Sequence, residues 1–215
     1  MMKVLYSGYY NDSGYPFHEL ADEVVLARSI DDLTETDSAL IIWGGADIDP
    51  ALYKHRQSRT TYPGGKRDYV EWELMNEAAR LGIPIIGVCR GAQMLCALAG
   101  GFLYQDVRGH AGSNHYVTTY DGERFRVNSI HHQMLGIPKE GDHVLLAWAS
   151  ERLSDRYIVQ NDIQSKPPEK EPEFVYFPKI KGYAIQWHPE AMDDVSLATQ
   201  FIMKEYYARA TTETV

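Results

Sequence analysis

The sequence has few cysteines, a shortage of positive charge and no long hydrophobic run. Its 215 residues include only two cysteines, Cys89 and Cys96, which excludes a disulfide framework and is typical of a reducing compartment. Lys and Arg total 21 against 30 Asp and Glu, and the formal charge of -9 argues against a nucleic-acid partner. Neither a membrane-spanning run nor a signal-peptide pattern is present. We therefore expect a cytoplasmic protein that binds neither nucleic acid nor membrane.

The length and the order of strand and helix signals indicate one α/β domain over residues 1–215. Strand and helix signals alternate in the first part of the chain, and strand signals dominate the second half. We predict a flavodoxin-like, open and mostly parallel sheet with helices on both faces and additional antiparallel strands in the second half. The early elements are expected as strands at 4–7, 39–43 and 83–88, and as helices around 19–30, at 68–81 and up to 99.

One segment, near 160–173, is dense in proline and charge. Proline and charged residues in such a run do not form a core element. We predict that this segment is an exposed loop or flap.

The pattern around Cys89 is typical of a nucleophile on a sharp turn. An apolar, β-branched run at 83–88 reads as a buried parallel strand, and a helical pattern follows the cysteine. Gly87 and Gly91 flank Cys89 and leave room for a strained backbone and a close approach of substrate. The helix N-terminus would favour the thiolate. The alternative is a buried structural cysteine, which we favour for Cys96.

A base for this nucleophile is found far along the chain. His188 follows an apolar stretch, and Glu190 comes two residues later, after a proline that fixes the chain direction. A cysteine nucleophile needs a base that accepts and returns a proton, and the base needs an orienting partner. We therefore interpret Cys89, His188 and Glu190 as a candidate catalytic triad, in preference to a surface or core histidine.

These two motifs together resemble the class I glutamine amidotransferases. They are Gly-x-Cys-x-Gly-x-Gln around Cys89 and His-Pro-Glu at residues 188–190. Four further segments resemble the peptidase C26 branch, which contains γ-glutamyl-γ-aminobutyrate hydrolase, so the resemblance extends over roughly residues 40–190. These segments are 43–53, 67–71, 101–106 and 127–133.

The resemblance implies a role for each matching residue. Cys89 would attack a γ-carboxamide carbon to give a γ-glutamyl thioester that water hydrolyses, with His188 as general acid and base and Glu190 as its orienting partner. The backbone N–H groups of Gly45 and Arg90 would hold the oxyanion. The residues expected to bind substrate are Gly44, Gln93, Ser129, His131 and His132.

Two other groups of polar residues receive structural interpretations. We interpret Arg67, Asp68 and Glu71 as the solvated first turn of a helix, where Asp68 is favoured by the helix dipole. The histidines 110, 115, 131 and 132 suggest a metal site, but their spacing matches no short zinc signature. We therefore expect no metal and no cofactor.

Three functions are compatible with this sequence. The leading hypothesis is a free-standing cysteine hydrolase of γ-glutamyl amide bonds, acting on a γ-glutamyl amine or on glutamine. The second is a glutaminase subunit that supplies ammonia to a separate synthetase or ligase. The third, less favoured because all three triad residues are present, is a non-catalytic binding or regulatory protein on the same fold. The sequence leaves open the amine leaving group and the oligomeric state.

Overall fold

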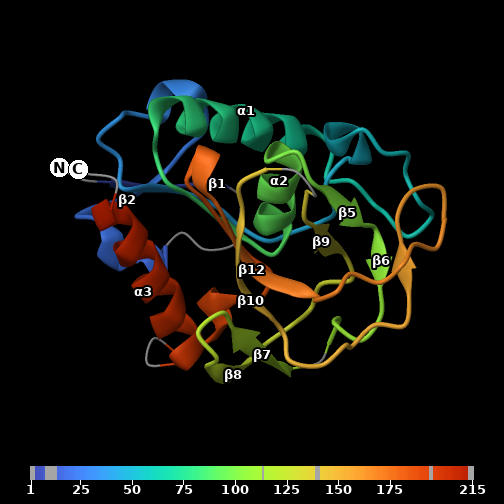
Figure 1. The fold of residues 1–215 in the computed structure, drawn as a ribbon. Helices are drawn as coiled ribbons and strands as arrows, with labels where there is room; N and C mark the ends of the chain where they lie inside the picture. The colour runs from blue at the N-terminus through green and yellow to red at the C-terminus, as the bar shows by residue number, and fades with distance from the viewer. Residues whose placement is uncertain (1–2, 8–13, 113, 139–140, 194–195, 213–215) are drawn as a thin grey trace.

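A mixed sheet is the centre of the fold in the computed structural model, which describes residues 3–7, 14–112, 114–138, 141–193 and 196–212 (Figure 1). Within these residues its strand order is β2-β1-β3-β4-β13-β12-β10-β7-β8. Neighbours from β2 to β13 pair in parallel, and those from β13 to β8 pair antiparallel. The predicted fold class is therefore confirmed. The bounds are β1 Lys3–Ser7, β2 Glu23–Leu26, β3 Ala39–Ile42, β4 Ile85–Val88, β7 His115–Thr119, β8 Arg124–Val127, β10 Val144–Ala149, β12 Pro172–Phe177 and β13 Gly182–Ile185.

Helices cover both faces of this sheet (Figure 1). Successive side chains of a strand point to opposite faces. Leu40 and Ile42 accordingly pack in the core cluster of α1 and α2, and Ile41 packs in the cluster that contains α3. Among the described helices, none combines the length and apolar character needed to cross a membrane. The bounds are α1 Lys66–Leu81, α2 Arg90–Leu98 and α3 Leu197–Thr212.

Short elements complete the described fold. Two small antiparallel pairs lie outside the main sheet, β5 with β9 and β6 with β11. The bounds are β5 Phe102–Tyr104, β6 Asp106–Val107, β9 Met134–Gly136, β11 Tyr157–Ile158, and the 3-10 turns η1 Phe17–Leu20, η2 Ile30–Asp32, η3 Pro50–Tyr53, η4 Pro178–Ile180 and η5 Pro189–Ala191.

The helix expected around 19–30 is not formed. This part of the chain contains the end of η1, the edge strand β2 and the start of η2. Strand β2 pairs in parallel with β1, so its backbone hydrogen bonds are made across the sheet instead of along a helix. The β-branched residues Val24 and Val25 favour this outcome, because they pack well on a pleated surface.

The segment near 160–173 is exposed only in part. Residues 161–170 are exposed or half-buried, as expected, but 171–173 are buried. Glu171 and Glu173 are only 2% and 0% exposed, and both contact buried histidines. The expectation of an exposed loop is therefore wrong for its last three residues, because tertiary partners compensate the two carboxylates.

Candidate functional site

Cys89 lies on a strained turn between β4 and α2. Its backbone has φ 51° and ψ -104°, a conformation that costs a non-glycine residue roughly 1–3 kcal/mol. Two hydrogen bonds fix it there: Cys89 N–H donates to Ile185 O at 2.7 Å, and Gln93 N–H donates to Cys89 O at 3.1 Å. The side chain is therefore held at the N-terminus of α2, as the sequence predicted.

The flanking glycines are required by backbone packing. A methyl group on Gly91 would lie 1.9 Å from Ile42 O, and one on Gly87 would lie 2.4 Å from Gly91 O. The space expected from the sequence beside these two glycines is therefore filled by backbone atoms of β3 and α2. Any larger residue at either position would displace the turn that carries Cys89.

His188 and Glu190 follow β13, the strand next to β4. His188 Nδ1 lies 2.7 Å from Glu190 Oε1. Asn128 lies in the segment 127–133, but no role was predicted for it from the sequence. It fixes the histidine backbone: its Nδ2 donates to His188 O at 2.9 Å, and its Oδ1 accepts from His188 N–H at 2.8 Å. The ring is therefore oriented by Glu190 and its backbone is held by Asn128.

His188 is positioned to be a cation beside the thiol. Burial lowers its pKa, but interactions with Cys89 and Glu190 outweigh burial and raise the pKa of His188 to about 10. Its Nε2 is buried and makes no hydrogen bond of good geometry within the described residues. Hydrogen bonds between a catalytic base and its nucleophile are often long or poorly aligned until substrate binds.

A cavity of about 240 Å³ brings the two halves of the candidate triad together. Gly44, Gly45, Cys89 and His188 are among its lining residues. A methyl group on Gly44 would lie 2.9 Å from His188 Cε1 and 3.7 Å from Cys89 Cβ, so a side chain at this position would crowd both residues. Gly45 has φ 152°, which few other residues adopt.

Most of the predicted substrate-binding residues line the same cavity. Gln93, His131 and His132 do so, and Gln93 Nε2 donates to Gln133 O at 3.2 Å. His132 contacts Asp47 Oδ1 at 3.0 Å, and this hydrogen bond raises the pKa of His132. Ser129 differs: it is buried and does not belong to the described lining, so the structure does not bring its side chain into the cavity.

The polar residues at the start of α1 are not solvated. Asp68 and Glu71 are buried, and both form ion pairs with the buried Arg90 guanidinium. Arg67 pairs with Glu71 at 2.8 Å and donates to Trp43 O and Gly44 O, each at 3.1 Å. The expectation of a solvated turn is therefore wrong. Sequence spacing did not reveal this network, because its cationic partner comes from α2.

The histidines that suggested a metal site separate into two places. His110, His115 and His131 surround the Glu173 carboxylate, and His132 lies apart, between Asp47 and Asp106. Glu173, the centre of the first group, is in β12 and far away in sequence. Histidine spacing alone could not identify it.

Comparisons with known proteins agree with this architecture. The sequence model of the family described as Peptidase C26 matches residues 22–123. The chain is 30% identical over 199 residues to a Mycobacterium tuberculosis protein named "Putative glutamine amidotransferase". The match covers 83% of this chain and 59% of that relative, so this chain spans less than two thirds of the relative's length. It is 31% identical over 147 residues to a Lactococcus lactis glutamine amidotransferase-like protein YvdE homolog, covering 55% of this chain and 77% of the relative.

A solved structure has the same fold. A Thermoplasma acidophilum protein with the description "putative gmp synthase subunit a protein" superposes with a TM-score of 0.61 at 16% identity, over 99% of this chain and 96% of that one. The family follows from the Lactococcus lactis relative, which is 31% identical and is covered over 77% of its length. The chain belongs to the peptidase C26 branch of the class I glutamine amidotransferase-like family.

Proposed function

We propose that this protein is a cysteine hydrolase that cleaves γ-glutamyl amide bonds through a γ-glutamyl thioester on Cys89. The observation that carries the proposal is the shared cavity: the cysteine on a strained turn and a histidine oriented by a carboxylate line it together. This arrangement fits nucleophilic acyl transfer, because the nucleophile and the base act on the same carbonyl group.

In the first step, the Cys89 thiolate attacks the γ-carbonyl carbon and the carbonyl π electrons move to oxygen. The amide N–H groups of Gly45 and Arg90 stabilise that oxyanion. Arg90 is the first residue of α2, so its N–H has no acceptor within the helix. When the C–N bond breaks, the His188 imidazolium donates its proton to the leaving amine, and the thioester remains on the sulfur.

In the second step, neutral His188 removes a proton from water. The resulting hydroxide adds to the thioester carbon, the C–S bond breaks, and glutamate leaves as a free acid. Glu190 keeps the imidazole oriented and stabilises its positive charge in both steps. Gln93, His131 and His132 provide the polar wall that contacts the glutamyl group.

The test is direct turnover by the purified protein. We expect release of glutamate from a series of γ-glutamyl amines or from glutamine, and loss of this release in Cys89→Ala and His188→Ala. Cys96→Ser, which changes a buried thiol outside the cavity, is the matched control and should retain activity. The proposal would be refuted if the protein hydrolysed neither γ-glutamyl amines nor glutamine.

A second candidate is a glutaminase subunit that supplies ammonia to a separate synthetase. The likeness in fold to a protein described as part of a GMP synthase favours it. This candidate predicts slow glutamine hydrolysis by the isolated chain and faster hydrolysis in the presence of an ATP-dependent ligase partner. Rapid hydrolysis of a γ-glutamyl amine without a partner would instead support the free-standing hydrolase.

A further inference from the structure

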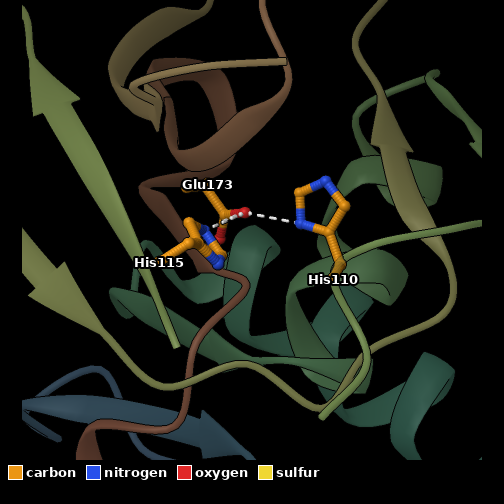
Figure 2. Close-up of side chains that lie close together, drawn as sticks. All are labelled: His110, His115 and Glu173. Carbon is orange, nitrogen blue, oxygen red and sulfur yellow. Dashed lines mark hydrogen bonds and ion pairs between the residues drawn. The ribbon is translucent and has the colours of Figure 1, made fainter. Parts of the chain in front are cut away.

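Three histidines converge on one carboxylate in the interior of the second half of the chain. Figure 2 shows His110 and His115 approaching Glu173 from different sides, and their ligand atoms lie within 4.8 Å of one another. Glu173 Oε1 is 3.1 Å from His110 Nδ1, 3.0 Å from His115 Nε2 and 3.6 Å from His131 Nε2. All four side chains are buried.

The hydrogen bond on the far side of His131 determines its tautomer. Nδ1 lies 2.9 Å from Gln133 O, and a carbonyl oxygen only accepts, so Nδ1 carries the proton. In the neutral ring, Nε2 then presents a lone pair. This atom is buried, has no hydrogen-bond partner among the described residues, and faces Glu173.

His110 is oriented in the same way by Glu171. The Glu171 carboxylate accepts from Leu153 N–H at 2.8 Å, Ser154 N–H at 3.0 Å and the Tyr157 hydroxyl at 2.5 Å, which is the pattern of an ionised, acceptor-only group. His110 Nε2, 3.2 Å from Glu171, therefore donates to it. The opposite nitrogen, Nδ1, lies 3.1 Å from Glu173 Oε1, so the ring bridges the two carboxylates.

The buried Glu173 carboxylate requires a compensating positive charge beside it, because an uncompensated charge in the interior is costly. We propose that His110, His115, His131 and Glu173 bind a divalent transition-metal ion of the Zn²⁺ class. The separations from Glu173 Oε1, 3.0–3.6 Å, are close to the roughly 3.3 Å edge of a tetrahedron with bonds of about 2.0–2.1 Å. The ligand atoms of His110, His115 and Glu173 lie within 4.8 Å of one another, so the histidine side chains would move closer together when the ion binds. Imidazole nitrogens with a carboxylate oxygen are a donor set that suits Zn²⁺.

The contacts outside the four ligands also fit a metal centre. Metal-binding histidines usually donate their second N–H to a carboxylate or a backbone carbonyl, as His110 does to Glu171 and His131 does to Gln133 O. Four protein ligands leave no open coordination position, which is typical of a structural ion. This proposal replaces the sequence expectation of no metal. The expectation rested on the spacing of the histidines, and Glu173, which completes the ligand set, is distant from them in the sequence.

The ion would join separate parts of the chain beside the candidate active site. His115 is in β7, Glu173 is in β12, and His110 and His131 are in loops. His131 also lines the cavity of Cys89. We therefore assign the ion the role of fixing the loop before β9, independently of the reaction that Cys89 performs.

Metal analysis of the full chain tests this proposal. We expect the protein, stripped with a chelator and then supplied with Zn²⁺, to bind one ion per chain and to unfold at a higher temperature than the stripped form. Co²⁺ in the same site should give the intense visible absorption of tetrahedral coordination. Neither readout depends on catalytic activity.

Variants locate the ion. Glu173→Gln removes the charged ligand and should weaken Zn²⁺ binding at least about tenfold. Glu171→Gln, which changes the carboxylate that orients His110 and leaves the four proposed ligands in place, should weaken Zn²⁺ binding by roughly ten- to a hundredfold. His143→Gln is the matched control, because His143 lines a different cavity and should leave binding unchanged.

Two results would overturn the proposal. One is a stripped wild-type protein that neither binds stoichiometric Zn²⁺ nor gains thermal stability from it, which would leave His110 as a plain imidazolium between Glu171 and Glu173. The other is Zn²⁺ binding that Glu173→Gln does not weaken. Circular dichroism of each variant separates loss of binding from loss of fold.

Discussion

Arg90, the residue directly after Cys89, forms a buried ion pair with Glu71 of α1. The two side chains are 1% and 0% exposed. Glu71 also holds Arg67, whose guanidinium donates to the carbonyls of Trp43 and Gly44. The turn that carries Cys89 and the turn at Gly44, which lines the same cavity, are thus connected through one carboxylate of α1.

We expect Glu71→Gln to lower the free energy of unfolding by about 1.5–3 kcal/mol, because it removes the carboxylate that pairs with Arg67 and leaves Arg90 with Asp68 as its remaining buried counter-charge. Denaturant unfolding measures the change. Glu77→Gln is the control on the same helix: Glu77 forms a surface pair with Arg80, and such pairs contribute little. Equal stability of the two variants would contradict this interpretation of the network.

We expect alkylation by iodoacetamide to modify Cys89 in the native protein and to leave Cys96 unmodified. Cys89 lines the cavity, whereas Cys96 is fully buried and burial raises the pKa of its thiol to about 12. Peptide mapping by mass spectrometry after brief labelling distinguishes the two sites. Preferential labelling of Cys96 would show that the nucleophile is misassigned.

The rate of hydrolysis should depend on the charge of His188. Burial opposes its protonation, but Cys89 and Glu190 raise the pKa of His188 to about 10, so the imidazolium is present at lower pH and lost as pH rises through about 10. We expect kcat/KM to fall along that basic limb. Glu190→Gln removes a negative charge and should move the limb to lower pH. An unchanged limb in this variant would argue against the pairing.

We expect Asn128→Ala to lower kcat by roughly a hundredfold, a loss typical of a misplaced catalytic group. The substitution removes both side-chain hydrogen bonds to the His188 backbone. Steady-state kinetics measure the effect. Asn76→Ala, on the surface of α1, removes a hydrogen bond to Trp72 O and should leave kcat unchanged. A similar kcat for both variants would rule out a positioning role for Asn128.

Local sequence was sufficient for the turn at Cys89 and for its partner. The β-branched run of β4, the glycines at 87 and 91, and the helical pattern after Cys89 each favour the same strand–turn–helix unit. His188 and Glu190 are two residues apart, so their contact is also a local property. These features were predicted because neighbouring residues alone favour them.

Only the tertiary structure decided which charged side chains are buried. Asp68 and Glu71 have the pattern of a solvated helix start, yet Arg90 from α2 buries them. Glu173 has the pattern of an exposed loop, yet three histidines from other segments enclose it. A charge enters the interior only when a compensating partner is present. These partners are distant in sequence, so only the folded chain reveals them.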